Sequence, residues 1–417
     1  MITVIKNIKK LVGIDIEGTL KFRAGAEMDK IDIIDNAFLI INDGLIYSFG
    51  NMEDIPCELF TSDGTLEMEV IDATGKFVLP AWCDSHTHIV YAQSREIEYI
   101  DKIKGLSYEE IAARGGGILN SAKKLHKASE EDLYNSAMER LELMRSFGTG
   151  AVEIKSGYGL TTESELKMLR VIKKLKEDSP LTIKSNFLGA HSIPLEYREK
   201  QEEYVDIVVN EMLPRVAEEN LADFVDVFCD KGFFTVEDTE RILEAAIKYG
   251  LRPKIHANEL GYTGGIQTGV KYNALSVDHL EFTGDDEIEA LLNSQTMPTI
   301  LPGAAFFLNM VYAPARNMIE AGLPVAMATD FNPGSSPSGN MQLIISMASI
   351  LYKLTPIEAI NAVTINTAYA MGVEKELGTI TVGKKANILI TKNIPSIEYI
   401  PYAYGENKIE KVIIGGK

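Results

Sequence analysis

The sequence predicts an α/β protein in which a (β/α)8 TIM-type barrel carries a small β-sandwich domain built from both ends of the chain. Three observations support this fold class. Eight short apolar runs alternate with helical patterns from residue 77 onward, strand-like patterns occupy both ends, and 417 residues suffice for one large barrel with additions. We expect residues 1–76 and 376–417 to form the composite sandwich and residues 77–375 to form the barrel.

Both ends of the chain have the pattern of β-structure. Residues 37–50, AFLIINDGLIYSFG, place two apolar runs on either side of Asn42-Asp43-Gly44, which is a strong hairpin signal. Residues 377–393, LGTITVGKKANILITKN, and the later segment KVIIGG are strand-like and interrupted by glycine. We expect the two ends to pair into one domain.

The eight barrel strands are predicted from short apolar runs. These runs are FVLPAWCDSH from Phe77, GAVEIKS from Gly150, TIKSNFLGAH from Thr182, FVDVFCD from Phe224, PKIHANE from Pro253, LSVDHLE from Leu275, MPTILPG from Met297 and PVAMATD from Pro324. Helical spacing predicts a helix over residues 163–177, and two segments, Ser107–Glu110 and Thr355–Glu358, read as capping boxes.

The composition limits the partners and the compartment. A net charge of −19 argues against nucleic acid or anionic lipid as the main partner, because both require a basic surface. No apolar stretch approaches the length of a membrane span, and residues 1–15 lack the apolar run of a secretory signal. The three cysteines, Cys57, Cys83 and Cys229, have no metal-binding or disulfide spacing, so we expect buried thiols in a reducing cytoplasm.

Histidine and aspartate residues gather at the predicted carboxyl ends of the barrel strands. Five of the 6 histidines lie there, and only His126, in a lysine-rich helical segment, does not. His86 and His88 are two residues apart, so in an extended segment both rings point to one side. Strand interiors of a barrel are expected to be apolar, whereas active sites lie at the carboxyl ends. The other members of the group are His191, His256, His279 and Asp330.

Imidazole and carboxylate groups without thiolates favour Zn²⁺ or Fe²⁺ in a site with an open position for water. Such a metal lowers the pKa of water toward neutrality, which is typical of hydrolases.

The ordered set of residues resembles the amidohydrolase superfamily. The resemblance extends over nearly the whole chain to the branch that hydrolyses 4-imidazolone-5-propanoate to N-formimino-L-glutamate in histidine degradation. The segments that carry it are DSHTHIVYAQSREIEY, GLSYEEIAARGGGI, EIKSGYGL, FLGAHSIP, DVFCDKGFF, HANELG, DHLE, LPGAAFFL and ATDFNPGSSP.

The resemblance implies a role for each residue of the site. The implied metal ligands are His86, His88, His256 and Asp330. Two-metal members of the family use a carboxylated lysine after strand four, where this chain has Cys229-Asp230 and Lys231 follows too late, so the resemblance implies one metal per subunit. The implied substrate contacts are Arg95, Tyr158, His191, Glu259, Asn332, Gly334 and Ser335, and the implied acid and base groups are Glu259, His279 and Asp330. Arg95 suits the propionate of the anionic small-molecule substrate, because a guanidinium binds a carboxylate in a bidentate manner.

Two other functions are compatible with the sequence. A related deaminase or deiminase would use the same site but release ammonia. A non-catalytic barrel would bind a metal or a small acid as a scaffold or sensor, although no member of the catalytic set is missing. A homodimer is the expected assembly for a cytoplasmic enzyme.

Overall fold

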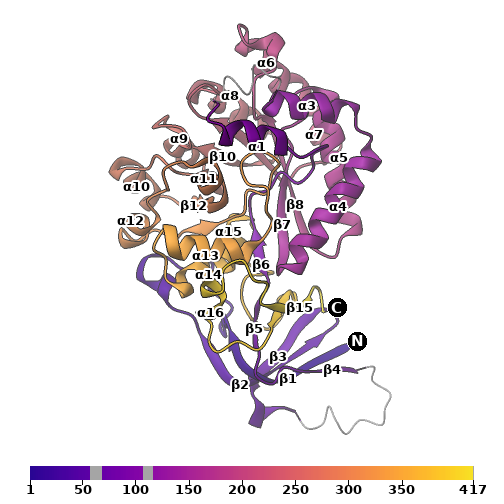
Figure 1. The fold of residues 1–417 in the computed structure, drawn as a ribbon, viewed down its shortest axis with the longest axis vertical. Helices are drawn as coiled ribbons and strands as arrows, with labels where there is room; N and C mark the ends of the chain where they lie inside the picture. Colours follow the sequence, from indigo (N-terminus) through magenta and orange to yellow (C-terminus); the bar gives the residue numbers. More distant parts are fainter. Residues whose placement is uncertain (57–67, 107–115, 417) are drawn as a thin grey trace.

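Eight parallel strands form the barrel, and their order in the sheet follows the sequence (Figure 1). The structure is a computed structural model that describes residues 1–56, 68–106 and 116–416. The predicted fold class is confirmed. The barrel strands are β6 (Trp82–Asp84), β7 (Thr149–Lys155), β8 (Thr182–Ala190), β9 (Phe224–Cys229), β10 (Arg252–Ala257), β11 (Ser276–His279), β12 (Met297–Ile300) and β13 (Ala326–Met327).

Residues just beyond β6 and β13 bring the first and last strands together. Thr87 and Phe331 form a parallel bridge, in which the N–H of His88 donates to the Phe331 carbonyl at 2.9 Å. The Asp84 carboxylate accepts bonds from the backbone N–H and the hydroxyl of Thr329, at 3.0 and 2.7 Å. The carboxyl ends of strands one and eight therefore lie side by side, which places His86, His88 and Asp330 at one mouth.

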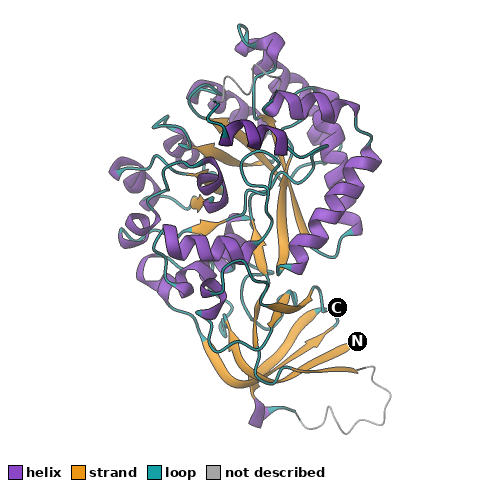
Figure 2. Ribbon diagram, viewed as in Figure 1, coloured by secondary structure: helices purple, strands orange, loops and turns teal. Residues whose placement is uncertain are grey.

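The terminal segments form a second, mixed sheet below the barrel (Figure 2). β5 lies between β14 from the C-terminal part and β1 from the N-terminal part, so strands from both parts share this sheet. The predicted boundaries of the two domains stay a prediction. The strands are β1 (Ile2–Val12), β2 (Ile33–Asn42), β3 (Leu45–Asn51), β4 (Met68–Asp72), β5 (Phe77–Pro80), β14 (Ile388–Thr391) and β15 (Ile409–Ile413).

The first predicted barrel run divides between the two sheets, which corrects the expectation of one strand from Phe77. Residues 77–80 form β5 of the terminal sheet, and the barrel begins at Trp82. All four residues of β5 and all three of β6 are buried, so a single apolar run could not reveal the change of sheet. The predicted hairpin is confirmed: β2 pairs with β3 around Asp43 and Gly44, both with positive φ, as a two-residue hairpin turn requires.

Helices surround the barrel, and the predicted helix over residues 163–177 is observed as α5. The capping box at Thr355 and Glu358 is confirmed at the start of α14, whereas the one predicted at residues 107–110 lies outside the described residues. The helices are α1 (Glu96–Ile103), α3 (Ile118–Lys127), α4 (Glu130–Ser146), α5 (Thr162–Asp178), α6 (Gln201–Ile207), α7 (Leu213–Glu218), α8 (Val236–Ile247), α9 (Gly265–Lys271), α10 (Asp285–Leu292), α11 (Pro302–Leu308), α12 (Ala315–Glu320), α13 (Met341–Leu351), α14 (Pro356–Val363), α15 (Ile365–Ala370) and α16 (Tyr399–Tyr402).

The largest apolar cluster joins barrel strands to the surrounding helices and includes Phe77, Leu79 and Leu389 of the terminal sheet. The next cluster lies within the terminal sheet. Among the described helices, none is both long enough and apolar enough to cross a bilayer.

Candidate metal-dependent active site

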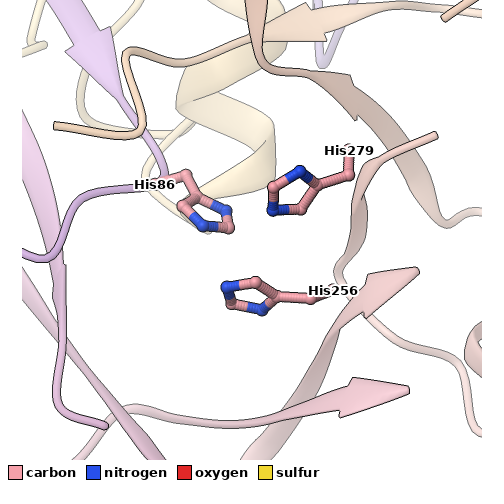
Figure 3. A group of neighbouring side chains, drawn as sticks. All are labelled: His86, His256 and His279. Carbon is pink, nitrogen blue, oxygen red and sulfur yellow. The ribbon is translucent and has the colours of Figure 1, made fainter. Parts of the chain in front are cut away.

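The ends of four barrel strands bring five histidines together at one mouth of the barrel. His86 and His88 follow β6, His191 follows β8, His256 lies in β10 and His279 ends β11, and all five are buried. The rings of His86, His256 and His279 point toward one another (Figure 3), and the centroids of His86 and His256 are 4.4 Å apart. The predicted convergence is therefore observed.

Buried carboxylates orient two of these rings from behind. The Nδ1 of His86 lies 2.7 Å from Asp278 Oδ2, and the Nδ1 of His256 lies 3.0 Å from Asp226 Oδ1. Because a carboxylate accepts the Nδ1 proton, each Nε2 keeps its lone pair and faces the mouth. The His256 Nε2 is buried without a hydrogen-bond partner in the described part of the chain. A buried lone pair without a donor is what a metal ligand requires before the metal is bound.

Three of the four predicted ligands, His86, His88 and Asp330, have spacings that suit a single metal ion. The Nε2 atoms of His86 and His88 are 3.3 Å apart, and each lies 3.6 Å from Asp330 Oδ1. Two ligands in a tetrahedral site with metal–nitrogen bonds of about 2.0 Å are about 3.3 Å apart. Metal-sized groups also include His86 with His256 and His279, and His88 with His191 and His256. The residues fit a metal, and their individual roles stay predictions.

Glu259 and His279 lie beside the ligand set in forms that suit acid–base chemistry. Their carboxylate and Nδ1 atoms are 3.6 Å apart. Burial, with smaller contributions from Asp330 and Asp230, raises the pKa of Glu259 to about 8. Burial keeps the pKa of His279 well below its ordinary value. Glu259 can therefore carry a proton at neutral pH, while His279 is neutral.

The backbone at His279 and Asp330 has an unusual conformation. His279 has φ of 87° and Asp330 has φ of 51°, a region that residues other than glycine rarely adopt.

The turn after β10 is held by Asp230, whose Oδ2 accepts the N–H groups of Glu259 at 2.6 Å and Leu260 at 2.9 Å. Sequence reasoning placed Asp230 at a strand end but assigned it no part in positioning Glu259.

Arg95 lies just before α1 and is held against the loop after β13. Its Nε donates to Glu98 at 2.7 Å. A Cβ on Gly334 would lie 2.2 Å from Arg95 Nη1, so the guanidinium packs directly on this glycine. The structure therefore brings together Arg95 and Gly334, which are both predicted to contact the substrate.

Tyr158 and His191 line the same mouth. The Tyr158 ring centroid is 5.4 Å from His191 and 5.8 Å from His88. His191 Nδ1 donates to the Gly157 carbonyl at 3.0 Å, and burial, followed by His256, lowers the pKa of His191 to about 3. The neutral ring therefore presents the Nε2 lone pair, which can accept a hydrogen bond from a substrate N–H.

The loop from Asp330 to Ser335 is ordered by its own polar groups. Asn332 Oδ1 accepts the N–H groups of Gly334 and Ser335 at 2.7 and 2.8 Å, and its Nδ2 donates to the Asp330 carbonyl at 2.7 Å. The Ser335 hydroxyl donates to Asp330 Oδ2 at 3.2 Å. This loop thus fixes Asp330, and substrate contact by Asn332 and Ser335 stays a prediction.

A charged network fills the barrel below the histidines, which corrects the expectation of apolar strand interiors. Lys155 Nζ lies 2.8 Å from Glu153 and 2.7 Å from Asp226, and Lys254 Nζ lies 2.5 Å from Glu153. All these side chains are buried. Alternating charges in VEIKS, FVDV and PKIH were the available signal, because residues two apart in a strand share a face.

Residues predicted to lie outside the site do so. His126 is exposed and bonds the Gly159 carbonyl at 2.6 Å, and Lys231 is exposed. Cys83 and Cys229 are buried free thiols, whereas Cys57 lies outside the described residues.

Comparison with known proteins places this site in a family. The amidohydrolase family profile matches residues 77–417. A protein of Flavobacterium johnsoniae named imidazolonepropionase is 57% identical over 417 residues, which cover 100% of both chains. The chain belongs to the imidazolonepropionases of the amidohydrolase family. Another imidazolonepropionase, from Alkaliphilus oremlandii, is 43% identical over 99% of this chain and 96% of its own length.

Solved structures of two deaminases share the fold. Guanine deaminase of E. coli has a TM-score of 0.74 at 13% identity, with coverage of 100% of this chain and 98% of that chain. A zinc-bound adenosine deaminase from Xanthomonas campestris has a TM-score of 0.72 at 15% identity, with coverage of 100% and 92%. At these identities the likeness concerns the fold alone. The solved structures therefore support the fold class, whereas membership of a hydrolase family rests on the family profile and the named relatives.

Proposed function

We propose that this chain hydrolyses the cyclic amide C–N bond of 4-imidazolone-5-propanoate and yields N-formimino-L-glutamate in histidine degradation. The observation that carries the proposal is the 57% identity to a named imidazolonepropionase over the full length of both chains. The convergence of the predicted residues at the barrel mouth supports it, because a hydrolase needs a water-activating centre, an acid and a substrate anchor in one place.

His86, His88, His256 and Asp330 would hold one zinc or iron ion per subunit. Such an ion lowers the pKa of water and polarises a carbonyl oxygen. The chain offers imidazoles and a carboxylate but no thiolate in this cluster, and that donor set suits either metal. Metal analysis of protein purified without added metal identifies which ion is present.

Proton transfer is assigned to Glu259 and His279, with Asp330 as a further acceptor. Neutral His279 can take a proton from the attacking water, whose oxygen bonds to the ring carbonyl carbon. Protonated Glu259 donates to the ring nitrogen as the C–N bond breaks, so this nitrogen leaves as the N–H of the formimino group. The 3.6 Å between the two side chains lets the proton return to Glu259 for the next turnover.

Substrate orientation is assigned to residues on three sides of the mouth. Arg95 would bind the propionate, and Gly334 leaves the room that its guanidinium occupies. The Tyr158 ring would lie against the imidazolone, and His191 Nε2 would accept a ring N–H. Asn332 and Ser335 would contribute through the loop that they order.

We also propose that the protein acts in the cytoplasm as a homodimer. Two described cysteines are free and buried, which is compatible with a reducing compartment. The net charge of −19 favours neither nucleic acid nor a membrane surface as a partner.

The test is turnover of imidazolone propionate by the purified, metal-loaded protein. We expect loss of the ultraviolet absorbance of the ring without release of ammonia. Ammonia released in step with substrate loss would instead assign a deaminase, and no turnover by metal-loaded protein would favour the non-catalytic barrel. Sedimentation velocity tests the dimer.

A further inference from the structure

A fully buried lysine lies behind the two imidazoles that carboxylates orient. Lys155 Nζ contacts Asp226 Oδ2 at 2.7 Å and Asp278 Oδ2 at 3.7 Å. The other oxygen of Asp226 accepts the Nδ1 proton of His256, and the same oxygen of Asp278 accepts that of His86. The Lys155 ammonium group therefore lies between the two carboxylates that orient the predicted metal ligands His86 and His256, which come from opposite strands of the barrel.

We propose that Lys155 is a positioning residue for the metal site, which holds His86 and His256 in register by fixing the carboxylates of Asp278 and Asp226. The inference rests on the proposed function only in requiring a metal at the mouth. The ion pairs of Lys155 are with Glu153, Asp226 and Asp278, none of which is a predicted metal ligand or substrate contact, so the proposed role is positioning and not catalysis.

The alternative supports of the two carboxylates are weaker. Ser276 donates to Asp278 Oδ1 at 2.6 Å, and Asn186 lies 3.3 Å from Asp226 Oδ2, but neither carries a charge. Asp226 and Asp278 belong to different strands, and Lys155 is the described cation within ion-pair distance of both. Without Lys155, the two buried carboxylates would lose their shared counter-ion. The His86 and His256 rings that they orient would then no longer be held in a fixed position relative to each other.

The second lysine of the network provides a matched control. Lys254 is equally buried, but its contacts are Glu153 at 2.5 Å and the Ser85 carbonyl at 3.1 Å. Of the described ion pairs within 4.0 Å, none joins Lys254 to Asp226 or Asp278. Two double variants remove the same charges. One combines Lys155→Met with Glu153→Gln, here called the Lys155 pair, and the other combines Lys254→Met with Glu153→Gln, here called the Lys254 pair. Each leaves one ammonium and both aspartates in the barrel.

The experiment measures Zn²⁺ affinity of the apo proteins by competition with a chelator at one pH, with thermal melts of each apo protein beside it. We expect the Lys155 pair to bind Zn²⁺ about 10- to 100-fold more weakly than wild type, which is the range for lost support of a metal ligand. The Lys254 pair should lose less affinity than the Lys155 pair, because the contact of Lys155 with Asp226, which orients His256, remains.

Three results would overturn the proposal. The first is equal Zn²⁺ affinity of the two pairs, and the second is a larger loss in the Lys254 pair. The third is a Lys155 pair that does not fold as apo protein, because Lys155 would then serve the fold rather than the metal site. Wild-type protein that binds no Zn²⁺, Fe²⁺ or Co²⁺ would instead contradict the metal-dependent function, and the two failures are thus distinct.

Discussion

At the scale of single residues, the site depends on environments that shift ordinary side chains into unusual states. Glu259 is a carboxylic acid with a pKa of about 8 because it is buried beside Asp330 and Asp230. His191 has a pKa of about 3 because it is buried beside His256. An acid that keeps its proton and a histidine that stays neutral are the forms that ring hydrolysis needs at neutral pH.

Glu259→Gln should lower kcat by about 10²- to 10⁴-fold, because the amide cannot donate a proton to the leaving nitrogen. Substrate binding should change less, since the glutamine has nearly the same shape. Steady-state kinetics on metal-loaded protein measure both effects. Wild-type kcat in this variant would contradict the assignment of Glu259 as the acid.

The pH profile of kcat/KM should decline as pH rises through about 8, the pKa of Glu259. The sign follows from the role of the group: the protonated form is active, and it is lost above its pKa. The decline should approach tenfold per pH unit, and it should be absent from the residual activity of Glu259→Gln. A profile that rises through this range would show that the ionised carboxylate is the active form.

Arg95→Ala should raise KM by about 10- to 100-fold with little change in kcat, because a charged contact remote from the scissile bond contributes mainly to uniform binding. Gly334→Ala should act in the same direction, since its Cβ would overlap the Arg95 guanidinium. Gly261→Ala is the control, because a Cβ there meets open space. Loss of kcat with unchanged KM in Arg95→Ala would contradict the role.

At the scale of elements, the turns after the strands position the chemistry more than the strands do. The turn after β10 presents Glu259 because Asp230 at the end of β9 accepts two of its N–H groups. The loop after β13 presents Asp330 because Asn332 and Ser335 bond within it. Parallel strands place such turns side by side at their carboxyl ends.

Asp230→Asn should lower kcat by about tenfold or more with a small effect on KM, because the amide keeps only one acceptor oxygen and cannot hold both the Glu259 turn and the Lys231 N–H. Asp238→Asn is the matched control: Asp238 also accepts a backbone N–H, that of Thr235, but in the capping box of α8 on the outside of the barrel. The control should lose about 1 kcal/mol of stability and no activity. Equal kinetic effects in both variants would contradict a positioning role for Asp230.

At the scale of the whole molecule, the negative net charge of the protein repels the anionic substrate that we propose for it. The net charge of −19 provides no attraction for a propionate, so a local positive centre is required. We propose that Arg95 and the metal supply that centre at the barrel mouth. The closure of the barrel through Asp84 and Thr329 holds the predicted ligands of strands one and eight on one side of it.

Removal of the metal should lower the melting temperature of the barrel. A ligand that binds only the folded state stabilises it by about 2.7 kcal/mol at 100 times its Kd. Scanning calorimetry with and without a chelator, followed by addition of Zn²⁺, measures the shift and its reversal. An identical melting temperature in all three conditions would contradict a metal bound by His86, His88, His256 and Asp330.

The amount that sequence could predict differed between the fold and the site. Periodicity predicts the strands, the hairpin at Asp43-Gly44 and the cap at Thr355, because each depends on neighbouring residues. The division of one apolar run into β5 and β6 could not be predicted, since both halves are equally buried. The pairing of Lys155 with Asp226 could not be predicted either, because these residues lie 71 positions apart in the chain.

The sequence by itself determined which residues reach the carboxyl ends of the strands, because strand position and side-chain alternation are local properties. It therefore indicated the five histidines, Asp330 and Glu259. Only the tertiary structure decided which nitrogen of His86 and His256 faces the mouth, and how charged residues can fill a barrel interior. Those features depend on contacts between strands distant in the chain, where burial makes each unpaired charge costly and every partner necessary.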